Sequence, residues 1–375
     1  MSRLWTWFID HYRAPRVLGL DLVRIWASLT VVAFHGSNYS HRGAILGRGW
    51  LAVDVFFVLS GWLLTGQALR LYARRESGWR FATGFWTRRW FRILPAYWLI
   101  ILLVTVLGAV LPIGFGLTRY NVIPYLLFLQ TVFGPNLYGV TWSLVAEEGF
   151  YLALPFVIIL FALIGRWRVT VAALGLILVF PLVARVIGLH TIDSWTLRQL
   201  PQFRFDGLVV GASLAAMWTV PRWRAQVMRA RMWLFAAGLV TFGFLYLFAA
   251  DGTLFYTAGL LAVAVSVGIM IPQLTLVRWP AFVPPIFALL VTFLSDLTYP
   301  LYLFHPLGFS LADLMNLRRG IVYFAVALPM ILGGAITIHV LVERPFLAWR
   351  ARLAAGSNLV EAAEPVPAQR MVVSV

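Results

Sequence analysis

Repeated apolar runs of about 20 residues constrain this chain more than any other feature. Hydrophobic residues make up 61% of its 375 residues and charged residues only 12%, whereas a soluble domain is about a quarter charged. A run of ~20 apolar residues can cross a bilayer as a helix. We predict an all-α, polytopic transmembrane helical bundle of about ten spans. The predicted spans are 18–38, 50–70, 93–114, 142–164, 169–187, 202–220, 232–250, 254–273, 284–312 and 320–342.

The distribution of arginine predicts which loops face the cytoplasm. The 30 basic residues are all Arg, and the formal net charge is +16. Ten spans with both termini inside place the Arg-rich segments 70–92 and 222–231 in the cytoplasm, which is the positive-inside pattern. Counting the short apolar segment 120–134 as an eleventh span would put 222–231 outside. We therefore predict ten spans with both termini cytoplasmic, and a re-entrant or interfacial position for 120–134.

Composition also limits the kinds of catalysis and the partners that this chain can be expected to have. The absence of Cys excludes disulfides and thiolate catalysis. No His/Cys set has zinc spacing and no glycine-rich phosphate loop occurs, so we expect no metal and no permanently bound cofactor. The Arg residues lie in short loops between spans, which does not favour a nucleic-acid partner. Residues 1–350 are predicted to form one membrane domain, and 351–375 a short, disordered cytoplasmic tail.

Three ionisable residues fall on one stripe of the first predicted span. Arg24 and His35 are eleven residues apart, which brings them within about 20° of the same helix face. Asp21 lies one turn before Arg24. A polar stripe facing lipid is costly, so we expect it to face the protein interior or a cavity. Neutral imidazole is a suitable general base near neutral pH, which makes His35 the leading catalytic candidate.

A second polar face lies on the fourth predicted span. Ser143, Glu147 and Tyr151 follow one another at intervals of four residues and so share a helix face. We expect Glu147 to lie at the depth of His35, where its carboxylate would orient the imidazole as in a catalytic triad. The alternative is a carboxylate near the start of a helix, favoured there by the helix dipole.

A cluster of arginines, Arg88, Arg89 and Arg92, precedes the third predicted span. Forked guanidinium groups suit phosphates. On spacing alone, ordinary anchoring to anionic lipid explains the cluster at least as well.

Other polar residues within the spans have weaker functional signals. Ser60 and Gly61 indicate a close-packing site rather than a nucleophile, because no base is adjacent to Ser60 in sequence. Arg204 and Asp206 are close in sequence and typical of a structural ion pair at a membrane boundary. His339 is predicted to be structural.

The ninth predicted span contains a candidate helix break. Pro300 and Pro306 bracket Tyr302 and His305. Broken membrane helices are tolerated where they line a cavity, so we expect His305 to face the same cavity as His35. The alternative is a kinked structural helix with interfacial aromatic residues.

Six sequence blocks, taken together, resemble acyltransferase family 3, a family of membrane-bound acyltransferases. They run in order through residues 19–346, and only their combination is specific. The blocks are Arg24 with His35, FFVLSGWLL at 56–64, RRWFRILPAYW at 88–98, WSLVAEEGFYL at 142–152, YPLYLFHPL at 299–307 and VERP ending at Pro345.

The resemblance implies transfer of an acyl group, usually acetyl, from cytoplasmic acyl-CoA to a hydroxyl of an envelope carbohydrate, lipid-linked sugar or other glycosylated acceptor. It implies a multi-pass protein of the cytoplasmic (inner) membrane, in contact with lipid. The arginines of the 88–92 cluster would bind the CoA phosphates. His35 would be the general base, with Glu147 orienting it and Arg24 stabilising the donor or the developing charge. Acetyl-CoA is the expected donor.

A transporter or flippase without covalent chemistry is the rival hypothesis. It would move lipid-linked or small glycosylated substrates. Inverted repeats and paired broken helices would favour it, and the sequence offers only one candidate break. Intramembrane charges argue against a third class, a receptor or scaffold.

Overall fold

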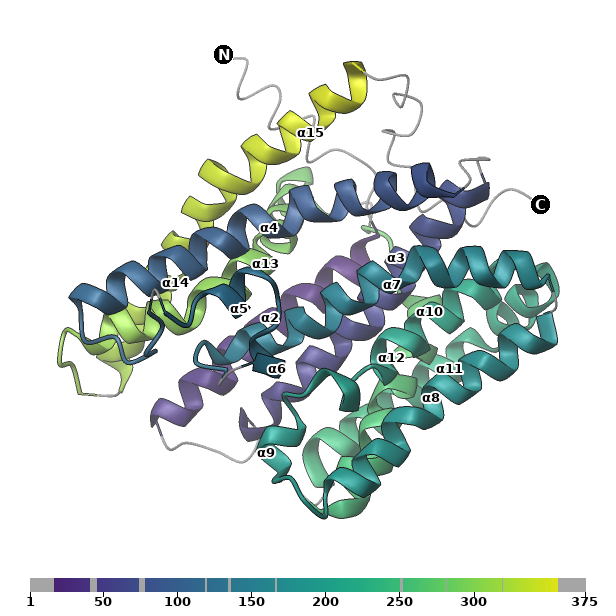
Figure 1. Cartoon of the computed structure of the whole chain (residues 1–375), viewed down its shortest axis with the longest axis horizontal. Helices are drawn as coiled ribbons and strands as arrows, with labels where there is room; N and C mark the ends of the chain where they lie inside the picture. Colours follow the sequence, from purple (N-terminus) through teal and green to yellow (C-terminus); the bar gives the residue numbers. More distant parts are fainter. Residues whose placement is uncertain are drawn as a thin grey trace.

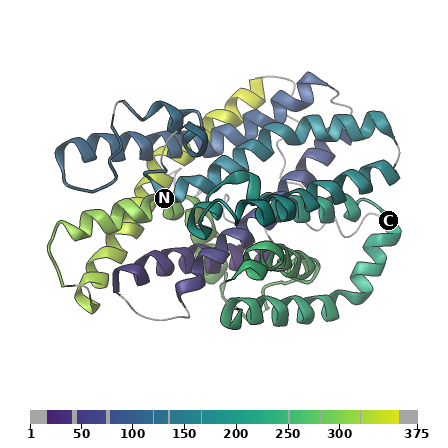
Figure 2. The same cartoon turned by 60° about the horizontal axis from the view of Figure 1, so that its bottom comes forward.

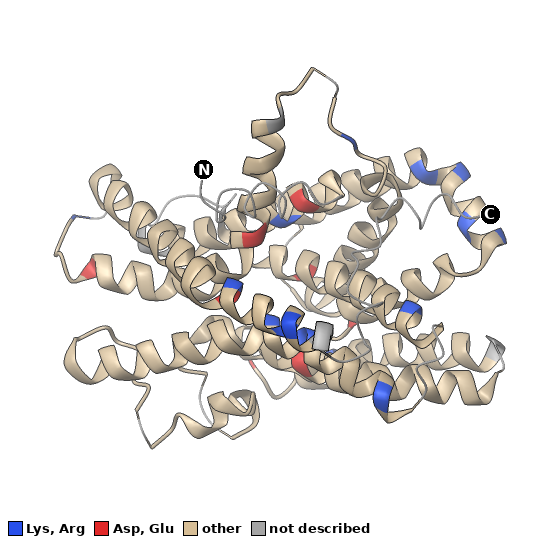
Figure 3. Ribbon diagram, turned by 90° about the horizontal axis from the view of Figure 1, so that it is seen from above, with Lys and Arg blue, Asp and Glu red and all other residues tan. Residues whose placement is uncertain are grey.

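The computed structural model describes residues 17–40, 46–73, 78–118, 120–133, 136–165, 167–249, 252–280, 282–318 and 320–356. All regular structure in these ranges is helical, as the sequence predicts. The helices pack side by side into one bundle (Figures 1 and 2). Figure 3 shows that charged positions are few and that several of them lie within the bundle.

Eleven longer helices and eight short helical turns make up the regular structure of the described residues. The longer helices are α2 (Leu18–Ser40), α3 (Ala52–Ala73), α4 (Trp79–Val110), α7 (Trp142–Ile164), α8 (Trp167–Gly188), α10 (Asp206–Trp218), α11 (Pro221–Phe248), α12 (Leu260–Leu274), α13 (Pro285–Asp313), α14 (Ile321–Ile338) and α15 (Arg344–Gly356). The short turns are η1 (Leu46–Leu51), α5 (Ile123–Leu126), α6 (Gln130–Phe133), η2 (Gly139–Thr141), α9 (Ser194–Leu197), η3 (Pro201–Phe203), η4 (Phe255–Gly259) and η5 (His339–Glu343).

Nine helical stretches in the described residues are long and apolar enough to cross a membrane. The protein is therefore a multi-pass membrane protein. The predicted span 202–220 is the exception to the prediction of ten, because it is a helix, α10, of only 13 residues. At 1.5 Å per residue it covers about 20 Å, short of the ~30 Å hydrocarbon core. Most of α10 is buried within the bundle.

Glycines let α10 lie directly against α3. A Cβ added to Gly61 would lie 2.1 Å from the Leu208 carbonyl oxygen, and one added to Gly211 would lie 2.1 Å from that of Val58. These distances are far below any contact that a side chain could make, so both positions require glycine. Small residues at helix contacts allow such approaches. The predicted packing role of the Ser60-Gly61 pair is confirmed for Gly61.

The segment 120–134 does not form a spanning helix within its described part. It contains α5 and α6, two short helices at one side of the bundle (Figures 1 and 2). The hydroxyl of Tyr97 on α4 donates to the Tyr125 carbonyl at 2.8 Å and ties the segment to the bundle. Excluding it from the spans is consistent with the structure.

Two predictions about element boundaries are wrong. We expected a helix break around Pro300 and Pro306, but α13 runs continuously from Pro285 to Asp313 with both prolines inside. The hydroxyl of Tyr138 donates to the Leu303 carbonyl at 2.6 Å and ties this part of α13 to the bundle. At the other boundary, α15 continues to Gly356, into the predicted tail. Residues 357–375 of that tail lie outside the described residues, as do residues 1–16.

Candidate active site

Among the described residues, a pair of neighbouring cavities contains the candidate site residues, and we name each cavity by its ionisable residues. The histidine cavity is formed where α2, η1, η2, α9 and α13 meet. Its lining residues are Val31, Phe34, His35, Trp50, Val53, Gly139, Val140, Trp142, Trp195, Arg198, Gln199 and Tyr302. The arginine cavity is the larger of the two. Its lining residues are Arg24, Val53, Phe56, Phe57, Leu59, Ser60, Arg89, Arg92, Ile93, Ser143, Leu144, Glu147, Tyr151, Ser295, Thr298, Tyr299 and Tyr302.

His35 is bonded to a second histidine. Nδ1 of His35 lies 3.0 Å from Nε2 of His305 on α13 and 3.0 Å from the Val31 carbonyl oxygen. Nδ1 of His305 lies 3.2 Å from the Leu301 carbonyl oxygen. The expected proximity of His35 and His305 is therefore confirmed, although it arises from a continuous helix.

These contacts define the tautomers of both neutral rings. A carbonyl oxygen only accepts, so Nδ1 of His305 carries a proton and its Nε2 carries a lone pair. Nδ1 of His35 then donates to Val31 and His305, and Nε2 of His35 is left with the lone pair. An imidazole held in this way can accept a proton at Nε2.

The polar stripe of α2 reaches both cavities. Arg24 lines the arginine cavity and His35 lines the histidine cavity. Asp21 is buried, accepts a hydrogen bond from Ser295 Oγ at 2.7 Å and lies 3.8 Å from Nη1 of Arg24. Asp21 therefore helps to position Arg24.

The arginine cluster lies inside α4, because this helix begins fourteen residues before the predicted span at 93. Arg89 and Arg92 line the arginine cavity. Arg89 donates a short hydrogen bond to Gln67, and Nη2 of Arg92 lies 4.0 Å from Oδ1 of Asp296. Arg88 is not among the lining residues. Arg92 is three residues from Arg89 and four from Arg88, so it lies on the helix surface between them, and the cavity is on the Arg89 side.

Glu147 does not contact His35. Its carboxylate accepts hydrogen bonds from Ser60 Oγ at 3.0 Å and from the Tyr151 hydroxyl at 2.5 Å. Both partners line the arginine cavity with it, as does Ser143. The predicted common face of Ser143, Glu147 and Tyr151 is thus present, but the expected direct orientation of His35 by Glu147 is not. The ring partner of His35 is His305.

Tyr302 and Val53 line both cavities and form the wall between them. The Tyr302 hydroxyl lies 2.6 Å from Ser143 Oγ and donates to the Val140 carbonyl at 2.9 Å. These bonds fix the phenol ring in the wall, with His35 lining the cavity on one side and Arg24, Arg89 and Arg92 lining the cavity on the other.

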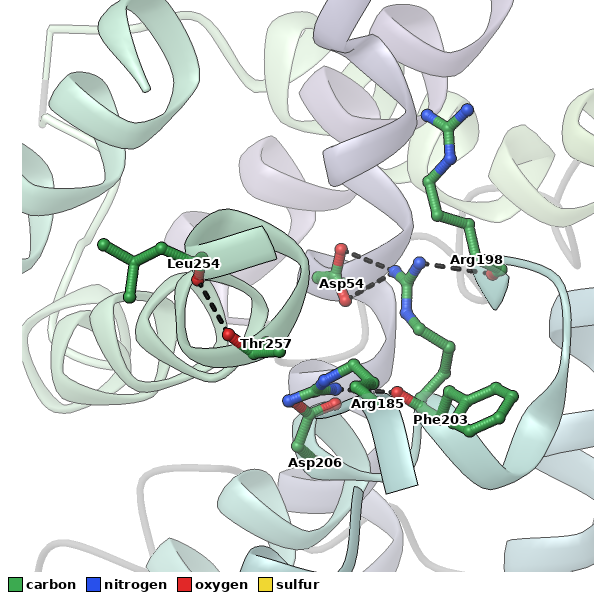
Figure 4. Close-up of polar contacts among 8 residues, drawn as sticks. Asp54, Arg185, Arg198, Phe203, Asp206, Leu254 and Thr257 are labelled. Atoms are coloured by element: carbon green, nitrogen blue, oxygen red, sulfur yellow. Dashed lines mark hydrogen bonds and ion pairs between the residues drawn. The ribbon is translucent and has the colours of Figure 1, made fainter. Parts of the chain in front are cut away.

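Two buried ion pairs stabilise the wall of the histidine cavity (Figure 4). Nη2 of Arg204 donates to both carboxylate oxygens of Asp54, at 2.7 and 2.8 Å, and Nη1 of Arg185 lies 2.9 Å from Oδ2 of Asp206. All four side chains are fully buried. The predicted pairing of Arg204 with Asp206 is therefore wrong, since each has a partner on another helix. The structural role expected of these residues is unchanged.

His339 has a buried partner on its own helical turn. Its Nδ1 lies 2.7 Å from Oε2 of Glu343 within η5, a turn of π-helix, in keeping with the structural role predicted for it. In the ranges that the structure describes, no group of three or more His, Asp or Glu side chains is placed to hold a metal ion.

Sequence reasoning missed three residues of the histidine cavity: Trp195, Arg198 and Gln199. They lie on and just after α9, in a connection between longer helices. No periodic sequence pattern there indicates which side chains face the interior. Asp193 caps α9 by accepting from the backbone N–H groups of Trp195 and Thr196, both at 2.9 Å. Hydrogen bonds from Thr196 hold the pKa of this exposed carboxyl below its usual value, so the capping group is ionised.

The membrane-embedded helical bundle thus holds the His35–His305 pair beside one cavity and arginines beside another, with Tyr302 and Val53 lining both. The sequence model of the acyltransferase family, described as an acyltransferase domain, matches residues 17–340. The chain belongs to this family, acyltransferase family 3.

Relatives of this chain carry names that refer to O-acetyl transfer. The peptidoglycan O-acetyltransferase OatA of Listeria monocytogenes is 26% identical over 320 residues, covering 79% of this chain and 50% of the relative. YrhL of Bacillus subtilis, whose name proposes peptidoglycan O-acetyltransferase activity, is 30% identical over 229 residues, covering 57% of this chain and 35% of the relative. A proposed O-acetyltransferase of Staphylococcus aureus is 27% identical over 237 residues, covering 56% and 36%.

This chain thus spans between about a third and a half of the length of these relatives. No solved structure matches the chain. The chain therefore contains the acyltransferase domain of this family, and its apolar helices make it a multi-pass membrane protein.

Proposed function

We propose that this chain transfers an acetyl group from acetyl-CoA to a hydroxyl of a cell-envelope carbohydrate. The observation that carries the proposal is the placement of His35 and the α4 arginines in two cavities that share the Tyr302 wall. Such an arrangement gives the donor and the acceptor separate entrances and one meeting point.

The arginine cavity suits the donor. CoA carries phosphates at one end and a thioester at the end of a thin arm. Arg89 and Arg92 line the cavity at the α4 side, and guanidinium groups bind phosphate oxygens in a forked geometry. Arg24, positioned by Asp21, lies on the path toward the wall and would stabilise negative charge on the thioester oxygen. Arg88 has no such position and would instead contact lipid.

The histidine cavity suits the acceptor. The acceptor hydroxyl would give its proton to Nε2 of His35 while its oxygen attacks the thioester carbonyl. The new C–O ester bond forms, the C–S bond breaks, and the CoA sulfur leaves with the proton returned from His35. His305 accepts from Nδ1–H throughout and stabilises the imidazolium ring by holding its orientation.

Glu147 acts in the donor cavity in this proposal. Its carboxylate, held by Ser60 and Tyr151, lies on the wall of the arginine cavity and would fix the position of the thioester arm. The resemblance to relatives named for peptidoglycan supports a carbohydrate acceptor in the cell envelope. The protein would lie in the cytoplasmic membrane, with the arginine cavity open to the cytoplasm.

The test is acetyl transfer by the purified chain in detergent or nanodiscs. Release of CoA from acetyl-CoA is followed with and without candidate carbohydrate acceptors, and the acetylated product is identified by mass spectrometry. Acceptor-dependent CoA release that disappears in His35→Ala supports the proposal. Acceptor transport without ester formation would instead establish the rival, a transporter.

A further inference from the structure

The wall of the histidine cavity beyond His35 combines a cation with indole rings. Cζ of Arg198 lies 4.6 Å from the ring centroid of Trp50 and 4.9 Å from that of Trp195. Both distances lie within the range of cation–π contacts, which arginine makes readily.

The buried charges behind this wall are neutralised by one another. Arg204 is paired with Asp54, and Arg185 with Asp206. Nη1 of Arg204 also donates to the Arg198 carbonyl at 3.2 Å, which fixes the backbone that carries Arg198. Figure 4 shows the Arg198 side chain extending away from these pairs.

Arg198 is the one permanently charged residue among the described lining residues of this cavity, and no carboxylate lines it. The charge of the lining is therefore positive. An anionic ligand would be attracted to this position.

Gln199 adds a second hydrogen-bond donor beside Arg198. Its amide oxygen accepts from Nδ2 of Asn136 at 3.1 Å, and the Asn136 oxygen accepts from the Thr141 hydroxyl at 3.1 Å. Since this chain of bonds engages the oxygen of Gln199, a ligand in the cavity meets its NH₂ group. Arg198 and Gln199 therefore both offer N–H donors, which match carboxylate or phosphate oxygens.

Aromatic rings cover much of the remaining wall. Trp142 and Trp195 line the cavity, and the Trp195 side chain is 54% exposed. A large exposed indole at a polar cavity offers a flat apolar face, against which the C–H face of a sugar ring can pack. Apolar walls with a few placed polar groups are typical of small-ligand sites.

We propose that the histidine cavity binds a saccharide that carries an acidic group. The sugar ring packs on the indoles of Trp142 and Trp195, the acidic group is bound by Arg198 and Gln199, and a ring hydroxyl is thereby placed at Nε2 of His35. The inference rests on the proposed function for the identity of this cavity as the acceptor site. The acidic group is a carboxylate on the sugar or a phosphate linking it to a carrier, which share the same donors.

The experiment compares three acceptor probes, methyl glucoside, glucuronate and glucose 1-phosphate, with the full chain in detergent. Direct binding is measured by equilibrium dialysis without a donor, and acetyl transfer is measured separately with acetyl-CoA. We expect the acidic probes to bind at least about tenfold more tightly than the neutral one, the effect of a hydrogen bond between charged groups. Preference for glucuronate or for glucose 1-phosphate identifies the carboxylate or the phosphate as the acidic group.

Two variants and one matched control locate the effect. Arg198→Gln should abolish the preference for acidic probes and leave binding of methyl glucoside within about twofold, since the bond to the Arg198 carbonyl involves only its backbone. Trp195→Ala should weaken the binding of all three probes, the neutral one included, because each sugar ring loses an indole surface. Arg318→Gln removes an exposed arginine that lines neither cavity, so the binding of all three probes should equal that of the wild-type chain.

Equal binding of neutral and acidic probes by the wild-type chain would overturn the proposal, as would an unchanged preference in Arg198→Gln. The binding and transfer measurements separate this proposal from the proposed function. Binding of the acidic probes that depends on Arg198, without any acetyl transfer, contradicts the acyltransferase assignment of the cavity but not its proposed ligand. Acetyl transfer without any preference for acidic probes contradicts the proposed ligand but not the acyltransferase assignment.

Discussion

His305 lies behind His35, with its Nε2 atom 3.0 Å from Nδ1 of the general-base candidate. This is the position that a carboxylate occupies in a Ser-His-Asp triad. A neutral imidazole in that position fixes the tautomer of His35 without adding a negative charge inside the membrane, where an unpaired carboxylate is costly.

The first prediction separates the two histidines. His35→Ala should lower acetyl transfer by a factor of about 10² or more, the usual loss for a missing general base. His305→Leu should also lower kcat, because the Nδ1 proton of His35 loses its acceptor, while the KM for acetyl-CoA stays near the wild-type value. His305→Gln, which keeps an oxygen acceptor, should restore part of the activity. Equal activity of the Leu and Gln variants would show that His305 only fills space.

The second prediction concerns the donor. Neutralising both Arg89 and Arg92 with Gln should weaken acetyl-CoA binding by about 10²-fold or more, since each bond between charged groups contributes roughly 1.5–3 kcal/mol. Arg88→Gln is the matched control from the same helix, and it should bind acetyl-CoA normally. Calorimetry with acetyl-CoA and with a truncated thioester lacking the nucleotide checks the cause. If the double variant weakens the binding of both thioesters by the same factor, the arginines do not bind the phosphates.

The third prediction concerns Glu147. Glu147→Gln keeps the size of the side chain but weakens its bonds to Ser60 and Tyr151, so transfer should slow while acetyl-CoA affinity is nearly kept. Ser60→Ala removes one of the two donors and should have a smaller effect in the same direction. Single-turnover kinetics distinguish the chemical step from binding. A large loss of donor affinity in both variants would assign Glu147 to binding instead.

The fourth prediction concerns the sides of the membrane. The native chain has no Cys, so single cysteines report position cleanly. Opposite sides for Thr191 and Arg229 require that the 13-residue α10 carries the chain across the membrane inside the bundle. On that topology, a cysteine at the exposed position Thr191 should react with an impermeant reagent from outside intact cells, and one at the exposed position Arg229 only after lysis. Labelling of both positions from one side would show that α10 does not cross, and the reverse pattern would place the histidine cavity toward the cytoplasm.

The fifth prediction concerns the contact of α3 with α10. Gly211→Val introduces a side chain where the nearest backbone atom leaves no room, and it should lower the yield of folded protein or its melting temperature. Overpacking of this kind typically costs about 1–3 kcal/mol or more. Gly243→Ala on α11, where an added Cβ meets nothing within 4 Å, is the control and should be tolerated. A fully stable Gly211→Val variant would mean that α10 can move away from α3.

Much of this architecture follows from one-dimensional patterns. Hydropathy locates the spanning helices because backbone groups in lipid must bond within their own helix. The i, i+4 spacing of Ser143, Glu147 and Tyr151 places them in one cavity, because such spacing depends only on helix geometry. Arg24 and His35 reach the two cavities for the same reason.

Which side chains on different helices contact one another does not follow from such patterns. Nothing local distinguishes His305 from Glu147 as the partner of His35, because the choice depends on how α13 and α7 pack around α2. The exchange of partners between the Arg204 and Arg185 ion pairs has the same cause, since Asp54 is 150 residues away in sequence. Trp195 and Arg198 lie in a connection between helices. The direction of their side chains there is set by the Asp193 cap of α9 and by the hydrogen bond from Arg204 to the Arg198 carbonyl.

The wall formed by Val53 and Tyr302 also bears on energy conservation in the cell. A protein with polar cavities opening toward both faces of a membrane is at risk of conducting protons, which would dissipate the proton-motive force. The Tyr302 hydroxyl is engaged by the Val140 carbonyl and by Ser143, and beside it Val53 presents only hydrocarbon. On the proposed topology, this thin layer keeps the water of the two compartments apart, so an acetyl group can cross between them while the membrane remains electrically insulating.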